Sequence, residues 1–325
     1  MNCLITSAGR RVSLTKIFKH KLLQSAGKLI AGDCDVMSPA LFFADSSILL
    51  PRIKAPDYVG FLLDYVQKNT IKLIIPTIDT ELSVYAAAKQ AFLDKGCLCL
   101  ISSADFVEIC SDKWNTYSFF SAQGVDVPHS WRDSADVPSA QTGQFIIKPR
   151  QGSASKDVFH TDYRGISQVI GNVDNPIIQE CLEGPEITID AYVSLDGQPK
   201  HYVPRLRIKA IGGESVVGRT IADAPIKDWI IDLLHLCAQH GAVGPLTLQA
   251  FLTERGPVLT EINPRFGGGF PLGYAAGGRY PDWIIDELHG ESVETAFGKY
   301  KVGLCMARYY EEHFFKYEDC ICKNS

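Results

Sequence analysis

Three polar side chains that could hold a metal ion lie close together in residues 246–269. Two apolar, β-prone runs flank a turn signal at 254–257, and this pattern predicts a β-hairpin. With the turn centred there, Gln249 lies opposite Glu261. Glu261 and Asn263 share a face, because side chains two apart on a strand point the same way. Two amides and a carboxylate offer the oxygen ligands that Mg²⁺ takes, together with waters and substrate phosphates.

An arginine and a run of glycines follow this hairpin. Arg265 comes after a proline, and residues 267–269 are glycines that let the backbone approach a ligand closely. The alternative is a surface hairpin whose polar residues face water, and the hairpin alone does not decide between the two.

Residues 144–155 place one lysine at the end of a predicted strand, ahead of a loop of small residues. Lys148 precedes Gly152-Ser153-Ala154-Ser155, and residues 157–160 resume as a strand. The N–H groups of such a loop could fold over a polyphosphate, with Lys148 as a point charge beneath. The loop is not of the Walker type, because no G-K-[ST] opens a helix. A plain mobile hairpin is the alternative.

A second lysine lies in the first turn of a predicted helix that Asp112 starts and Gly124 closes. Because a lysine there opposes the helix dipole, an anionic partner would suit Lys113. A solvated lysine is the default.

Two strands joined by a tight turn are predicted over residues 176–190. The exposed main chain at a strand end could hydrogen-bond a purine edge, and Glu186 just beyond could take ribose hydroxyls.

An alternating strand over 202–209 places three cations, Arg205, Arg207 and Lys209, on one face. Like charges repel, so we expect this face to meet an anionic ligand. Residues 211–215 are interpreted as a mobile loop.

The first hundred residues predict an open parallel sheet, beginning with a strand at 2–6 and a helix after Gly9, Arg10 and Arg11. The G-x-G-x-x-G pattern is absent, which gives dinucleotide binding poor support, but this loop could still bind an anion. Asp79 follows the strand 72–76, at the edge where ligands bind in such sheets. The slightly favoured alternative is that Asp79 or Thr80 caps the next helix.

Composition excludes several functional classes. The chain has 325 residues, enough for two or three lobes, and its 46% apolar and 21% charged content is that of a soluble globular protein. A net charge of −5 gives no general attraction to nucleic acid or anionic membrane. We expect no membrane span and no signal peptide. Ten cysteines without C-x-x-C suggest reduced, mostly buried thiols and a cytoplasmic location.

Taken in order, these stretches resemble the ATP-grasp superfamily, and most closely the synthetase domains of the carbamoyl phosphate synthetase large subunit and its single-copy relatives. The resemblance covers roughly residues 1–290. It is carried by F-I-I-K-P-R-Q-G-S-A-S, Q-E-C-L-E-G-P-E and L-T-E-I-N-P-R-F-G-G-G.

The resemblance implies a role for each candidate residue. Lys113 and Lys148 would contact ATP phosphates beneath a lid loop at Gly152–Ser155. Glu180 to Leu182 would bind adenine, and Glu186 would bind ribose. Gln249, Glu261 and Asn263 would hold Mg²⁺, with two ions bridged by the glutamate and Mn²⁺ as a substitute. Arg265 would bind the transferred phosphoryl group and then an acyl phosphate. Arg205, Arg207, Gly9, Arg10 and Asp79 would bound the acceptor pocket.

The activity implied is an ATP-dependent carboxylate–amine ligase that forms an acyl phosphate and then an amide. The nearest family carries two synthetase copies, whereas this chain has one and no glutaminase-like segment. A carbamoyl-phosphate-forming subunit that uses bicarbonate and ammonia is the alternative, and a non-catalytic ATP-binding protein is a third. The expected partners are small-molecule acids and amines, and a homodimer is common among such relatives.

The expected fold is an N-terminal open parallel α/β domain (1–110) followed by a two-lobed ATP-grasp domain (111–290). The lid lobe would span about 113–183 and the metal-site lobe about 184–290. Residues 291–325 would form a C-terminal extension.

Overall fold

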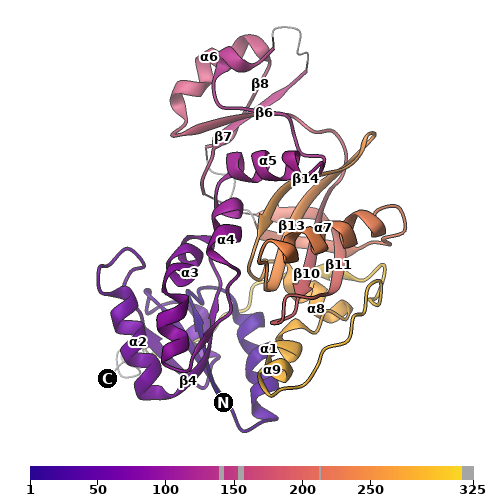
Figure 1. Cartoon of the computed structure of the whole chain (residues 1–325). Coiled ribbons are helices and arrows are strands. Elements are labelled where there is room, and N and C mark those ends of the chain that lie inside the picture. Colours follow the sequence, from indigo (N-terminus) through magenta and orange to yellow (C-terminus); the bar gives the residue numbers. More distant parts are fainter. Residues whose placement is uncertain (139–142, 153–156, 212–213, 317–325) are drawn as a thin grey trace.

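The computed structural model describes residues 1–138, 143–152, 157–211 and 214–316. Its strands form three sheets, and the chain passes through them in sequence order. This arrangement confirms the expected fold, a parallel α/β sheet followed by two antiparallel lobes (Figure 1).

The first sheet is parallel, with strand order β3-β2-β1-β4-β5. Its three inner strands, β1, β2 and β4, are mostly buried and have largely apolar sequences, whereas the edge strand β3 is partly exposed. The elements of this region are β1 (Asn2–Thr6), α1 (Val12–Leu23), β2 (Lys28–Asp33), a 3₁₀ turn η1 (Pro39–Phe42), β3 (Ser46–Leu49), α2 (Tyr58–Asn69), β4 (Ile71–Pro76), α3 (Asp79–Asp94) and β5 (Leu98–Cys99).

Two helices lead from this sheet to a small four-stranded sheet of order β6-β9-β7-β8, which we call the lid lobe. Figure 1 shows α5 lying between the lid lobe and the rest of the molecule. The elements are α4 (Ala104–Ser111), α5 (Lys113–Ala122), β6 (Ser130–Trp131), η2 (Ser134–Asp136), β7 (Phe145–Pro149), β8 (Phe159–Thr161), η3 (Tyr163–Gly165), α6 (Ile166–Val169), η4 (Ile170–Asn172) and β9 (Pro176–Glu180).

The third sheet has six strands in the order β14-β13-β10-β11-β12-β15. Helix α7 covers it with the apolar stripe predicted from the sequence, including Ile230, Leu233, Leu234 and Cys237. The elements are β10 (Glu186–Val193), β11 (Pro199–Ile211), β12 (Glu214–Thr220), α7 (Lys227–Gln239), β13 (Gly244–Thr253), β14 (Gly256–Asn263), α8 (Phe270–Ala276), α9 (Tyr280–Leu288) and β15 (Cys305–Ala307).

Two local expectations were wrong. Residues 211–215 are not simply a loop, because Ile211 ends β11 and Ser215 lies in β12, paired with Ala210. Asp79 and Thr80 do not cap α3. Glu81 supplies the carboxylate instead, and its Oε1 accepts from the N–H groups of Thr77 at 2.7 Å and Ile78 at 3.4 Å. The Asp79 carboxylate is therefore not used in capping α3.

None of the described helices is both long and apolar enough to cross a bilayer.

Glu81 is fully buried, and it ties the ends of β1 and β4 to the start of α3. Its Oε2 accepts from the Ser7 hydroxyl at 2.9 Å. Burial raises the pKa of this carboxyl from 4.5 to about 7, against the opposing effect of its hydrogen bonds. The folded chain therefore takes up a proton that the unfolded chain releases between about pH 4.5 and 7.

We predict that the stability contributed by this proton is fully present below about pH 4.5 and is lost as pH rises through 7. The loss corresponds to about 3 kcal/mol of the free energy of unfolding. Urea unfolding at pH 5 and pH 8 should show the loss in the native chain and in Glu108→Gln, a control on the exposed face of α4. Glu81→Gln should show less pH dependence, and an unchanged profile in that variant would contradict the assignment.

Candidate active site

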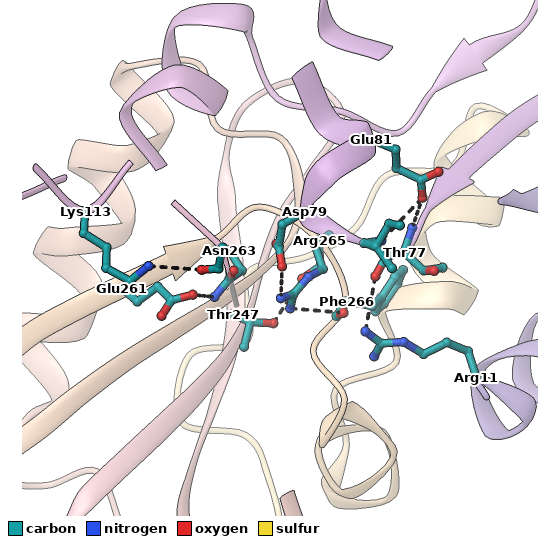
Figure 2. A network of polar contacts seen from close by, with 12 residues as sticks. Arg11, Thr77, Asp79, Glu81, Lys113, Thr247, Glu261, Asn263, Arg265 and Phe266 are labelled. Atoms are coloured by element: carbon teal, nitrogen blue, oxygen red, sulfur yellow. Dashed lines mark hydrogen bonds and ion pairs between the residues drawn. The ribbon is translucent and has the colours of Figure 1, made fainter. Parts of the chain in front are cut away.

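A cavity of about 740 Å³ opens where the first sheet, α4–α5 and the six-stranded sheet meet. It collects residues that are far apart in the sequence, as Figure 2 shows for the part around Arg265. Ten of the predicted site residues line it, namely Arg10, Asp79, Lys113, Gly152, Arg205, Arg207, Gln249, Glu261, Asn263 and Arg265.

The predicted hairpin is confirmed as β13 and β14, and Gln249 does lie opposite Glu261. The turn is tighter than expected, with Thr253 paired to Gly256, and a bulge between Gln249 and Ala250 restores the pairing. Asn263 donates from Nδ2 to Glu261 Oε1 at 2.9 Å, so these two side chains converge on the cavity.

These side chains fit a hard cation that has other ligands available. Among the described residues, no group of three or more His, Cys, Asp and Glu side chains comes together. Gln249, Glu261 and Asn263 contain one carboxylate and two amides, all cavity-lining. Such a set suits Mg²⁺ bound also by waters and phosphate oxygens, and not a cation held in an all-protein cage.

Arg265 crosses from the hairpin to the first domain. Its Nη2 donates to Asp79 Oδ2 at 2.8 Å, and both side chains line the cavity (Figure 2). Two atoms of this pair, Arg265 Nε and Asp79 Oδ1, are buried without a hydrogen-bond partner. The pair therefore retains donor and acceptor capacity for a ligand.

Lys113 lies on the side of the site toward the lid lobe. Lys113 Nζ donates to the carbonyls of Gly152 at 3.0 Å and Arg150 at 3.4 Å. As predicted, Asp112 caps α5 by accepting from Trp114 N–H at 2.8 Å, and it also forms an ion pair with Arg150 at 2.8 Å.

Lys148 does not line the cavity, but charged residues of the site change its pKa. Desolvation, together with the positive charge of Lys113, lowers the pKa of Lys148 from 10.5 to about 8, while Glu261 and Glu186 act in the opposite direction. A neighbouring anion would restore its positive charge.

The residues predicted to bind the purine and ribose also lie outside the cavity lining. The Glu180 carboxylate accepts from His129 N–H at 3.0 Å and pairs with Arg255 in the β13–β14 turn. Cys181 N–H donates to the Gln144 carbonyl at 2.8 Å and Glu180 N–H donates to the His129 carbonyl at 3.0 Å, so neither donor is available to a purine. Purine binding by the main chain of Leu182 and by the other main-chain groups of this segment remains a prediction. Glu186 Oε1 accepts from Arg207 at 2.6 Å.

The argument from three repelling cations was wrong. Arg205 pairs with Asp190 at 2.8 Å and Arg207 pairs with Glu186, so carboxylates of β10 already offset two of the charges. Lys209 follows a register shift after Arg207, is exposed and does not line the cavity. Protein side chains, and not only a ligand, therefore relieve the repulsion.

Gly9 is also accounted for within the protein. Its N–H donates to Asp33 Oδ2 at 2.7 Å, and it does not line the cavity. Ser153, Ala154 and Ser155 lie outside the described residues, so their predicted contact with phosphates stays a prediction.

Sequence reasoning missed several cavity-lining hydroxyls, among them those of Thr247 and Ser215. Thr247 pairs with Asn263, and its Oγ1 donates to the Arg265 carbonyl at 3.0 Å. The alternation that selected Gln249 would also have selected Thr247, two residues earlier. No signal in the sequence marked Ser215, because it was assigned to a loop.

Two family models match the chain in succession. Residues 3–100 match the PylC-like N-terminal domain, and residues 110–269 match the ATP-grasp domain. An uncharacterized protein of Sinorhizobium fredii is 27% identical in an alignment of 192 residues, and the match covers 50% of this chain and 37% of that protein. The match thus spans well under half the length of this curated relative.

Solved structures support the fold. The chain is similar to an L-amino acid ligase from Bacillus licheniformis, with a TM-score of 0.69 and 17% identity over 88% of this chain and 73% of that one. It is also similar to N5-carboxyaminoimidazole synthetase from Staphylococcus aureus complexed with ADP, with a TM-score of 0.72 and 14% identity over 93% and 79%. The biotin carboxylase domain of 2-oxoglutarate carboxylase from Hydrogenobacter thermophilus gives a TM-score of 0.72 and 12% identity over 93% and 73%.

Three motifs in order, the three-sheet fold and both domain matches point to one conclusion: the chain belongs to the ATP-grasp superfamily, with a PylC-like domain preceding its ATP-grasp domain.

Proposed function

We propose that this protein is an ATP-dependent carboxylate–amine ligase that releases ADP and phosphate. The observation that carries the proposal is the meeting of Gln249, Glu261 and Asn263 with Lys113 and Arg265 in one cavity, whose opposite wall is the PylC-like domain. A magnesium-phosphate site on one side and a separate wall on the other suit a reaction between ATP and small substrates.

The proposed reaction has two steps. A carboxylate oxygen of the acid attacks the γ-phosphorus of ATP, so that the bond to the β-phosphate oxygen breaks and ADP leaves. The amine nitrogen then attacks the acyl carbon, phosphate leaves, and the nitrogen loses a proton to give the amide. The first step converts an oxide leaving group into phosphate, and it needs charge neutralisation and positioning more than covalent catalysis.

Named side chains would do this work. Mg²⁺ bound by Gln249, Glu261 and Asn263 would neutralise charge on the phosphates. Lys113 and Lys148 would bind phosphate oxygens from the lid side, and Arg265 would hold the transferred phosphoryl group. Asp79 would keep Arg265 oriented toward the first domain, where we place the acceptor pocket.

The proposal is tested by ADP release from Mg²⁺-ATP across a panel of carboxylates, each with and without amines. ADP release that depends on one acid–amine pair, with a matching amide product, supports a ligase. Stimulation by bicarbonate alone would instead support carbamoyl phosphate formation. Binding of ATP without acceptor-dependent ADP release across the panel would contradict the proposal.

We predict that Glu261→Gln lowers acceptor-dependent ADP release by about 100-fold, because it removes the only carboxylate of the proposed metal site. Glu254→Gln is a matched control on the same hairpin, since Glu254 is exposed in the turn. It should retain full activity. Equal rates in the two variants would refute the metal assignment, provided that both variants have the same unfolding temperature as the native chain.

We predict that ATP binds more weakly as pH rises through about 8. Lys148 has a lowered pKa of about 8 in the free protein, and bound phosphate favours its charged form. ATP binding is therefore coupled to protonation of Lys148, which becomes less favourable as pH rises above 8.

Calorimetric titration with ATP at pH 7, 8 and 9 measures this dependence. Lys148→Met should bind less tightly at pH 7 and show less change with pH. Lys54→Met, at an exposed position of the first domain, should behave as the native chain. If the native chain and Lys148→Met had the same pH dependence, Lys148 would not contact the phosphates.

A further inference from the structure

Arg205 is almost completely buried, with 2% of its surface exposed, yet one end of its guanidinium has no partner. Nε and Nη2 donate to the two oxygens of Asp190, at 2.8 and 3.4 Å. Nη1 makes no hydrogen bond, although Arg205 lines the cavity. An unsatisfied buried donor is destabilising, so it calls for an explanation.

The protein makes room for this side chain. A Cβ on Gly269 would lie 2.5 Å from the guanidinium carbon of Arg205 and 2.6 Å from Nη1. No side chain larger than glycine fits there without displacing the guanidinium. The third glycine of the run after Arg265 is thus needed for the packing of Arg205, while its neighbours line the same cavity.

A second orphaned group belongs to the neighbouring strand. Ser215 of β12 is 4% exposed, its Oγ has no hydrogen-bond partner, and it lines the cavity. β12 pairs with β11, the strand that carries Arg205, and Ser215 lies opposite Ala210. Its Oγ lies near Gly218, the residue opposite Arg207, because a Cβ on Gly218 would lie 3.4 Å from it. Two adjacent strands therefore each bring a buried, unsatisfied polar atom to the same cavity.

The electrostatics of the wall favour an anion. Asp190 occupies one edge of the Arg205 guanidinium, and an N–H of a charged group forms its strongest hydrogen bond with an anionic oxygen. Among the described residues that line the cavity, six are cations and two are carboxylates. Asp79 is bound to Arg265 and Glu261 to Asn263, so neither carboxylate satisfies Arg205. The cations are Arg10, Arg11, Lys113, Arg205, Arg207 and Arg265.

From these observations we infer that Arg205 and Ser215 form an anion subsite for a carboxylate or phosphate group that does not react. One of the two substrates therefore carries a second anionic group. That the bound group belongs to a substrate rests on the proposed function, whereas the anion binding itself does not. The subsite is separate from the hairpin residues that would hold the metal, because Arg205 and Gln249 both lie opposite Thr188, on the strands at either side of β10. Two strand spacings, about 10 Å, therefore lie between their backbones.

The test is calorimetric binding without ATP, so that it does not depend on turnover. The dicarboxylate glutarate is compared with the monocarboxylate butyrate, and glycerol 3-phosphate is compared with glycerol. We expect at least one of the two anionic probes to bind at least tenfold more tightly than its matched partner. Which probe does so distinguishes a carboxylate from a phosphate as the bound group.

Variants locate the binding. Arg205→Lys keeps a positive charge beside Asp190 but removes the outer N–H groups, and it should weaken binding of the favoured probe at least tenfold. Ser215→Ala should weaken it several-fold. Arg279→Lys is the matched control, because Arg279 also forms an ion pair, with Asp282, but lies outside the cavity lining. It should bind the probe as the native chain does.

Three results would overturn the inference: no binding of either anionic probe, equal binding of matched probes, or unchanged binding in Arg205→Lys. If the anion bound through Arg205 but no acid–amine pair released ADP, the ligase proposal would fail and the subsite would stand.

Discussion

One extra residue in β14 determines which side chains face the cavity. Thr260 and Glu261 together stand against Gln249, and Thr260 Oγ1 donates to the Gln249 carbonyl at 3.1 Å. Without the bulge, strict alternation would turn Glu261 toward the apolar core on the other face of the sheet. With it, Leu259 and Ile262 both pack in the core beneath α7. The core and the proposed metal site are compatible only because the strand is interrupted at this point.

Contacts between lobes complete the site around this hairpin. Lys113 binds the main chain of residues 150 and 152, which links α5 to the lid lobe. Arg265 binds Asp79 of the first domain. Each contact uses a charged group that the proposed reaction needs for phosphate, so a bound nucleotide would compete with or rearrange protein contacts that already exist. The site is thus held in shape by the groups that would hold the ligand.

Much of this arrangement was predictable from the sequence, because local patterns specify it. Hairpin signals located Gln249 and Glu261 correctly, and strand-end position placed Asp79 at the cavity. Contacts between distant segments were not predictable in the same way. The hypothesis that Asp79 caps α3 was wrong because Glu81, two residues later, supplies the capping carboxylate. The alternation of apolar and polar residues does not predict the bulge. Ser215 could be placed at the cavity only from the pairing of β12 with β11.

The arginines of β11 show why a pattern can be right about position and wrong about cause. Arg205 and Arg207 do line the cavity, but Asp190 and Glu186 on the adjacent strand offset their charges. A buried ion pair gives little net stability, because the desolvation of both groups opposes their attraction. Its use here is geometric, since Asp190 takes one edge of the guanidinium and fixes where the other edge points. A donor held in this way loses little conformational entropy when a ligand binds, and this preorganisation is what a selective anion subsite requires.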